Sequence, residues 1–434
     1  MTVERAVPQP GIEPRSLATR RYVLALLVVV YTFNFIDRQI LAILLPAIKA
    51  EFGVTDTILG FLAGSAFALF YATLGVPIAL VADRWNRRNL IALALAIWSG
   101  MTALSGVATN IVQLSLARIG VGVGEAGCSP PAHSIISDLY SPHERSTAMG
   151  IFTLGISAGI MIAYLAGGWV AENIGWREAF LVVGLPGLAL ALLVRFTIRE
   201  PVRGQSDGKK DSAARPGILA VAKFLLGRRS FLHLAMGSGL AAFIGYAIIS
   251  FFPTFLFRSH EMNVSEIGVW LGIIVGTAGG LGYAGGGYIA DRLGRRGQRY
   301  ALWGVTAATM VAWLFHLPVF LVGNPYLALA LFVVPAIFAN FYLPTTFAQV
   351  QGMVGLRMRA VASALLLFIL NSVGLGLGPL VAGFLSDLLE GPFAGDSMRY
   401  SLLFIALVVG PWSAWHYFAA GRHIEADLAR ADEA

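Results

Sequence analysis

Long apolar stretches, separated by short polar segments, run through the whole chain. Each stretch has about 20 residues or more, the length of α-helix that crosses a hydrocarbon core about 30 Å thick. The pattern therefore predicts an all-α membrane protein with twelve transmembrane helices. The predicted spans are residues 22–45, 58–81, 89–108, 111–138, 145–171, 177–198, 231–257, 267–290, 299–322, 325–354, 359–388 and 399–421.

Composition supports lipid as the solvent. The chain is 57% hydrophobic and only 13% charged, with a mean hydropathy of +0.73, whereas a soluble domain carries about 25% charged residues. Cys128 is the only cysteine, so no disulfide or cysteine-based metal site can form within one chain. Residues 1–21 are polar and lack the features of a cleaved signal peptide. We expect neither a cofactor nor a metal.

The basic residues are distributed unevenly across the predicted membrane. Of the 31 Lys and Arg residues, three lie inside spans and four lie in the loops opposite the termini or at their edges, when a residue at the very end of a span is counted with its loop. The rest lie on the side of the two termini, which an excess of Lys and Arg marks as cytoplasmic. We therefore predict a multi-pass protein of the plasma (bacterial inner) membrane with both termini in the cytoplasm. The net charge of +7 then reflects topology and requires no nucleic-acid partner.

A repeated loop divides the chain into two related halves. The sequence ALVADRWNRR at 79–88 follows the second span, and GYIADRLGRR at 287–296 follows the eighth. Such a repeat is typical of a duplicated transporter. The expected organisation is an N-terminal tail, a six-helix bundle, a cytoplasmic linker that ends in a short surface helix, a second bundle and a cytoplasmic tail. Their bounds are 1–21, 22–198, 199–230, 231–421 and 422–434.

These loops resemble the signature loop of the major facilitator superfamily, G-x-L-A-D-R-x-G-R-R. The second copy has both glycines, whereas the first has Ala79 and Asn86 in their places. The resemblance implies a cytoplasmic latch that favours an outward-open state. From their places near helix ends, the aspartates could cap a helix or pair with a helix N-terminus of the opposing half. The later arginines should lie at the headgroup level, and positive-inside anchoring alone would account for them. The implied latch residues are Asp83, Arg84, Arg87, Arg88, Asp291, Arg292, Arg295 and Arg296.

Further segments resemble the Spinster branch of this superfamily. They are NFIDR at 34–38, the Asn-Arg variant of the loop, RIGVGVGEA at 118–126, GWREAF at 175–180 and REP at 199–201. Animal members of that branch move sphingosine-1-phosphate or lysophospholipids. The resemblance therefore implies an amphiphilic, lysolipid-like substrate and a transporter that works as a monomer.

Charged residues away from the ends of the spans are few and lie in one half. Asp37 and Arg38 fall in the first span, and Arg118 and Glu125 in the fourth, whereas the seventh and tenth spans contain no Asp, Glu, Lys or Arg. Because such groups cost about 2.5–3.5 kcal/mol to insert, they indicate function. We predict a proton-coupling site with Glu125 as principal carrier and Asp37 coupled to it. An ion-pair network that only locks helices together is the alternative.

Helix geometry limits how these four groups can pair. Asp37 and Arg38 are adjacent and point about 100° apart, while Arg118 and Glu125 are separated by about 10 Å along the helix axis. The pairs should therefore cross between spans, as Arg38 with Glu125 or Asp37 with Arg118. The arginines would tune the proton affinity of the carboxylates or hold an anionic headgroup.

Polar residues within spans are candidates for contact with the substrate. The candidates are Asn34, Arg38, Arg118, His133, Asn340, Tyr342 and Asn371. The C-terminal ones are equally consistent with hydrogen bonds between helices, and His133 with a proton relay or a helix contact. Gly268, Gly272, Gly276 and Gly280 line one helix face and should pack against a neighbouring span. Gly122, Gly124 and Gly127 match the dinucleotide pattern but lie inside a span, so we interpret them as packing glycines.

The sequence thus predicts a secondary transporter that uses alternating access, couples to protons and moves an amphiphilic lysolipid- or sphingolipid-like anion. A proton-coupled exporter of hydrophobic drugs and a symporter of small organic acids are alternatives. A non-transporting membrane sensor is the alternative of another class. An enzyme is not expected, because no nucleophile–base arrangement or nucleotide-binding loop is visible.

Overall fold

The computed structural model describes residues 16–203, 217–355 and 358–430, which fold almost entirely into helices. The first half comprises α1 (Leu17–Phe52), α2 (Asp56–Gly60), η1 (Phe61–Ser65), α3 (Ala66–Arg84), α4 (Arg87–Gly106), α5 (Ile111–Glu125), α6 (Ser129–Leu139), α7 (Pro142–Asn173) and α8 (Trp176–Thr197). The second half comprises α9 (Ile218–Leu226), α10 (Arg229–His260), α11 (Val264–Gly294), α12 (Gln298–Leu321), α13 (Pro325–Phe338), α14 (Tyr342–Gly352), α15 (Arg359–Ile369), η2 (Leu370–Leu377), α16 (Gly378–Phe393), η3 (Ala394–Asp396) and α17 (Ser397–Ala429).

These helices account for the twelve predicted spans. Ten stretches of the described chain are long and apolar enough to cross a membrane, and the last of them, 361–429, contains both α16 and α17. The twelfth span is the broken pair α5 and α6 over 111–139. The helix α17 continues to Ala429, into the segment predicted to be the C-terminal tail. The short surface helix predicted in the linker is confirmed as α9.

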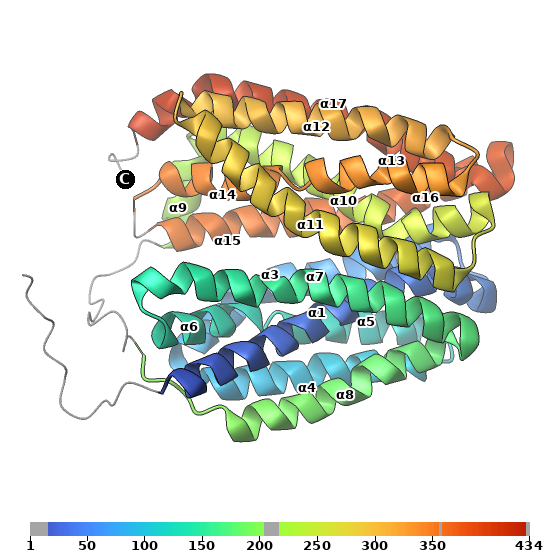
Figure 1. Ribbon diagram of the computed structural model, residues 1–434, viewed down its shortest axis with the longest axis horizontal. Coiled ribbons are helices and arrows are strands. Elements are labelled where there is room, and N and C mark those ends of the chain that lie inside the picture. Colours follow the sequence, from blue (N-terminus) through green and yellow to red (C-terminus); the bar gives the residue numbers. More distant parts are fainter. Residues whose placement is uncertain (1–15, 204–216, 356–357, 431–434) are drawn as a thin grey trace, which may run out of the picture.

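The two halves form two layers that lie along each other, with both ends of the described chain at the same end of the bundle (Figure 1). We call this the terminal end and the opposite one the distal end. Side-chain caps fix several helix starts, since an oxygen from Asn or Ser satisfies a free N–H of the first turn. Asn86 accepts a hydrogen bond from the Asn89 N–H at 2.9 Å and so caps α4. Asparagine therefore serves as a helix cap at the position where the signature loop usually has glycine.

Glycines allow the two halves to approach closely along α7 and α11. A Cβ at Gly268 would lie 2.3 Å from the carbonyl oxygen of Tyr164, and one at Gly276 would lie 2.9 Å from the Met161 side chain. Neither contact leaves room for a methyl group. The glycine ladder of α11 therefore packs against a neighbouring span, as predicted.

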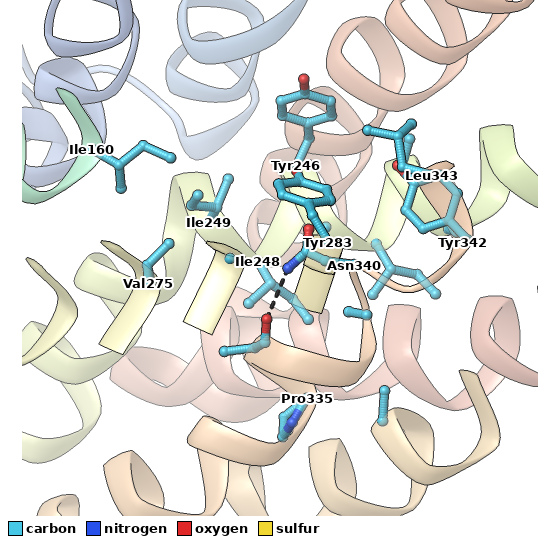
Figure 2. Close-up of a pocket in the computed structure, with 18 of the residues that line it drawn as sticks. Ile160, Tyr246, Ile248, Ile249, Val275, Tyr283, Pro335, Asn340, Tyr342 and Leu343 are labelled. Atoms are coloured by element: carbon cyan, nitrogen blue, oxygen red, sulfur yellow. Dashed lines mark hydrogen bonds between the residues drawn. The ribbon is translucent and has the colours of Figure 1, made fainter. Parts of the chain in front are cut away.

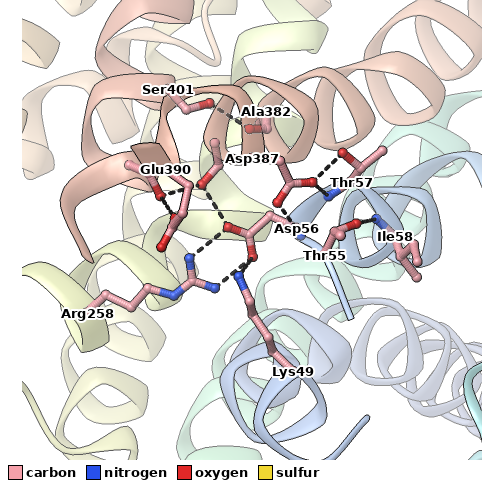
Figure 3. Close-up of polar contacts among 12 residues, drawn as sticks. Lys49, Thr55, Asp56, Thr57, Ile58, Arg258, Ala382, Asp387, Glu390 and Ser401 are labelled. Carbon is pink, nitrogen blue, oxygen red and sulfur yellow. Dashed lines mark hydrogen bonds and ion pairs between the residues drawn. The ribbon is translucent and has the colours of Figure 1, made fainter. Parts of the chain in front are cut away.

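A polar cluster, which we call the distal gate, joins the halves at the distal end (Figure 3). Asp56 of α2 is fully buried and accepts two hydrogen bonds of 2.7 Å from Arg258 of α10. It also accepts from Lys49 at 2.8 Å and from Ser386 at 2.7 Å. In return, Asp387 of α16 accepts from the backbone N–H of Asp56 and caps α2 at 2.8 Å. Because a buried carboxylate is stable only when paired, this cluster holds the distal end closed.

Hydrogen bonds between the described residues of the two halves lie midway along the bundle or at the distal end. Ser65 donates to the Gly376 carbonyl at 2.6 Å, and Tyr164 donates to the Ile249 carbonyl at 2.9 Å. An apolar core at the same level contains Leu44 of α1 and Phe252 of α10. The structure is therefore sealed on the distal side of its centre.

Candidate transport site

A cavity of about 270 Å³ lies between the two halves, and most of its wall comes from the second half. The first half contributes Phe35, Arg38 and Gln39 of α1 and three residues of α7. The second half contributes residues of α10 to α15, η2 and α17. Figure 2 shows part of this wall, where the polar groups of Tyr246, Tyr283 and Asn340 stand among apolar side chains. The cavity thus has one charged region, at Arg38, and a largely apolar remainder.

Arg38 forms an ion pair with Glu125 at the edge of the cavity. Its Nη2 and Nε atoms donate to Glu125 Oε2 at 2.7 and 3.2 Å. The guanidinium lies within 5.0 Å of the ring centres of Phe35, Phe67 and Tyr71, a setting that favours a cation. Only 10% of the Arg38 side chain is exposed, and that of Glu125 is not exposed at all. Arg38 therefore separates the cavity from a buried carboxylate.

The adjacent Asp37 points away from the cavity and into the first half. Its side chain is fully buried, and Arg118 Nη1 donates at 3.1 Å to its backbone carbonyl rather than to its carboxylate. Of the two pairings that helix geometry allowed, the structure contains Arg38 with Glu125. Arg118 is also fully buried and lies beside both carboxylates.

Glycines bring the carboxylate of α5 into this position. A Cβ at Gly122 would lie 2.6 Å from the Phe67 carbonyl oxygen, and one at Gly124 would lie 2.7 Å from the Trp98 backbone nitrogen. These close approaches support the packing interpretation of the glycine motif. The helix then breaks directly after Glu125, where Cys128 N–H bonds back to the Glu125 carbonyl at 3.1 Å. Glu125 thus stands at the end of a helix.

The predicted substrate residues fall into two groups. Asn340, Tyr342 and Asn371 line the cavity, as Arg38 does. The amides of Asn340 and Asn371 donate to carbonyls of their own helices at 2.8 and 2.9 Å, which leaves the amide oxygens as acceptors. Asn34, Arg118 and His133 do not belong to the described lining. Asn34 and Arg118 are buried beside Glu125.

His133 lies on α6, outside the ion-pair region. Its side chain is exposed, and its ring meets Phe152 edge-on at 5.4 Å. The ring contact joins α6 to α7, and the proton relay stays a prediction.

Several lining residues escaped the sequence analysis. Tyr246 of α10 faces Arg38 across the cavity, and Tyr283 of α11 lies next to Tyr246. Trp313 and His316 of α12 line its far end. Only their polar atoms within apolar helices could have marked them, and the same signal occurs at many interhelical hydrogen bonds.

The first signature loop is anchored within its own half. Arg87 is buried and donates to Glu200 at 2.7 Å, to Asp138 at 2.5 Å and to the Pro201 carbonyl at 2.9 Å. These partners turn the Arg87 guanidinium into its own half rather than towards the surrounding lipid. Arg88 is only partly exposed and bonds the Ile198 carbonyl at 3.2 Å.

The second signature loop differs from the first in the exposure of its charged residues. Its charged residues are exposed, and Asp291 lies within α11 rather than at the N-terminus of an opposing helix. The side chains of Asp83 and Arg84 lie outside the described part of the structure. The exposed residues of the second loop are Asp291, Arg292, Arg295 and Arg296.

Two six-helix halves around a central cavity, with embedded charges beside it, define a membrane transporter of the alternating-access class. The family model described as Major Facilitator Superfamily matches residues 27–379. An "MFS-type efflux pump" of Mycolicibacterium smegmatis is 32% identical over 93% of this chain and 92% of its own length. Protein spinster homolog 1 of Xenopus tropicalis is 31% identical over 58% of this chain and 48% of its own length.

Among solved structures, a bacterial homologue of the human lysosomal transporter Spinster superposes with a TM-score of 0.88. It is 32% identical, with 95% of this chain and 99% of that chain covered, and its conformation is inward-facing and unoccupied. The chain therefore belongs to the Major Facilitator Superfamily and is a Spinster-like member of it. It is a secondary transporter and not an enzyme.

Proposed function

We propose that this transporter moves an amphiphilic, lysolipid- or sphingolipid-like anion and is driven by protons. The observation that carries the proposal is the Arg38–Glu125 ion pair, whose arginine lines the cavity while its carboxylate is buried behind it. In this proposal both termini face the cytoplasm of a bacterial cell, the distal end faces outward, and the protein works as a monomer.

One ion pair can connect the two ligands. When Glu125 takes up a proton, Arg38 loses its partner and becomes an uncompensated cation in a setting with little water. Such a cation binds an anionic headgroup strongly, and a guanidinium can hold a phosphate with two hydrogen bonds. When Glu125 loses the proton, it competes with the headgroup for the same guanidinium. Proton and substrate therefore favour each other at this site.

The rest of the cavity suits the apolar part of such a substrate. Away from Arg38, the wall reaches Ala312 of α12, Phe332 of α13 and Ala406 of α17. These side chains offer no charge, so an acyl chain would replace water there at little polar cost. Tyr246 and Gln39 lie nearer the charged region and supply hydrogen-bonding groups for a headgroup. The resemblance of the sequence to the Spinster branch implies the same substrate class.

Export of hydrophobic drugs is the second candidate. It is favoured by the name of the M. smegmatis relative and by the apolar wall. A drug without an anionic group would not need Arg38, so the two candidates differ in how strongly they depend on that side chain.

The test uses purified protein in liposomes with an imposed pH gradient and an internal pH dye. Lysophosphatidylglycerol serves as the anionic probe and a hydrophobic cationic dye as the drug probe. We expect proton movement that requires lysophosphatidylglycerol and is abolished by Glu125→Gln. Glu51→Gln is the matched control, since Glu51 pairs with Arg177 at the outer rim of the same half.

Two results would count against the proposal. Lysophosphatidylglycerol flux that persists unchanged in Glu125→Gln would remove the proton site. Proton-coupled flux of the dye alone, unaffected by Arg38→Gln, would replace lipid transport with drug export.

A further inference from the structure

Asp37 faces a group of donors on α4 that the ion pair at the cavity does not use. Trp98 and Thr102 are four residues apart, so they share one face of that helix. Both are fully buried, and both are close enough to interact with the Asp37 carboxylate. Neither reaches the geometry of a full hydrogen bond with any described residue, and the same holds for both oxygens of Asp37.

Unsatisfied polar atoms rarely gather in a protein interior. More than about nine in ten buried polar groups have a partner, so those without one call for an explanation. Here the Trp98 Nε1, the Thr102 Oγ1 and both Asp37 oxygens lie together in the first half. A donor that makes no hydrogen bond to a protonated carboxylic acid can move within bonding distance once the acid becomes a carboxylate, because hydrogen bonds to a charged group are shorter and stronger.

The charged groups around Asp37 all come from α1 and α5. Glu125 and Arg118 lie nearest, and Arg38 lies beyond them as the partner of Glu125. From α4, the facing groups are neutral donors. The charge state of Asp37 is therefore governed by the interior of the first half. The α1 residues at the cavity are Phe35, Arg38 and Gln39, so a substrate there contacts the neighbours of Asp37 and not Asp37 itself.

We propose that Thr102 and Trp98 are positioning residues that hold the Asp37 carboxylate whenever it is deprotonated. The inference rests on the proposed proton coupling and deepens it. It gives the transporter two proton sites of different character: Glu125, which competes with substrate for Arg38, and Asp37, which is held by a donor pocket that the substrate does not touch. Proton release at Asp37 then depends on α4, a helix that contributes nothing to the described cavity wall.

The test reads conformation directly and requires no substrate. Spin labels are attached at Ile174 and Gly323, exposed distal-end positions on opposite halves, in full-length protein with Cys128→Ala, reconstituted in lipid nanodiscs. The distance distribution is measured across a pH titration, and its midpoint is the observable. Because Thr102→Val removes a donor to the anion, the protonated form should persist to higher pH. We expect the midpoint to rise by about one pH unit.

The controls separate hydrogen bonding from packing. Thr102→Ser retains the hydroxyl and should keep the original midpoint. Ser105→Ala, on the same helix, removes a hydroxyl that bonds only the Met101 carbonyl of its own helix at 3.0 Å, and should also change nothing. Trp98→Phe should shift the midpoint in the same direction as Thr102→Val, and it serves as the second variant should Thr102→Val not fold.

Each other outcome is decisive. Original midpoints in Thr102→Val and Trp98→Phe would overturn the donor pocket while leaving proton coupling intact. An equal shift in Thr102→Ser would assign the effect to packing and overturn it as well. If the original protein shows no pH-dependent change, or if Asp37→Asn and Glu125→Gln both leave the midpoint in place, the proposed proton coupling itself fails and the donor pocket fails with it.

Discussion

Removing Arg258 should open the distal end of the transporter. Arg258→Gln takes two charge-assisted hydrogen bonds of 2.7 Å from the buried Asp56. Losing one partner of a buried ion pair costs about 3–5 kcal/mol. Because Lys49 and Ser386 still donate to Asp56, we expect a smaller loss, about 2–3 kcal/mol.

This loss acts on only one state of the transporter. Arg258 and Asp56 belong to opposite halves, so the bonds exist only while the distal end is closed. A loss of about 2–3 kcal/mol shifts the equilibrium towards the distal-open state by about 30- to 150-fold. The temperature of thermal unfolding should change less, because the distal-open state lacks the Arg258–Asp56 hydrogen bonds in the original protein as well as in the variant.

The assay is the distance between spin labels at Ile174 and Gly323 at a fixed pH. Arg177→Gln provides a matched control, because the Arg177–Glu51 pair of 2.5 Å lies at the same end but within one half. We expect a longer mean distance in Arg258→Gln and an unchanged one in Arg177→Gln. The reasoning is refuted if Arg258→Gln keeps the original distribution, or if the control opens the protein equally.

Three further predictions test the packing. Gly383→Ala places a methyl group 2.0 Å from a backbone oxygen of α2 and should also favour the distal-open state in the spin-label assay, whereas Gly391→Ala, in the same helix with free space around it, should not. Arg87→Gln should lower the free energy of unfolding by about 1.5–3 kcal/mol because it removes charge-assisted hydrogen bonds to Asp138 and Glu200, whereas Arg295→Gln at an exposed site should stay within about 0.5 kcal/mol, as chemical denaturation can show. Ala406→Leu fills the apolar end of the cavity, so liposome uptake of long-chain lysophosphatidylglycerol should fall more than uptake of a short-chain homologue. Equal losses for the two lipids would mean that the acyl chain does not bind at this end of the cavity.

The fold could be predicted from the sequence because lipid imposes a strong constraint. Apolar stretches of spanning length and a repeated loop leave few arrangements of twelve helices. The ends of the helices were less predictable. The last helix continues to Ala429 although its final two turns are polar, since Asp427 accepts a hydrogen bond from the Ser230 N–H and fastens that end to α10.

The candidate site was predictable where charged or polar side chains lie within apolar spans, and its apolar wall was not. The adjacency of Asp37 and Arg38 required them to face different ways, which reduced their partners to two possibilities. Arg87 could not be placed, because a buried arginine and a surface anchor look the same in a basic loop; its partners Asp138 and Glu200 are far away in the sequence. The cavity wall left no signal, since residues such as Ala312 and Ala406 differ from lipid-facing alanines only in where the fold puts them.

The uneven wall of the cavity has an evolutionary consequence. Most of its surface belongs to one half, while the Arg38–Glu125 ion pair belongs to the other. Mutations that reshape the wall can therefore change the cargo while the energy source stays as it was. Under the proposed function, transporters with this arrangement could acquire new substrates through mutations in the second half. The first half would stay under constraint because it couples transport to protons.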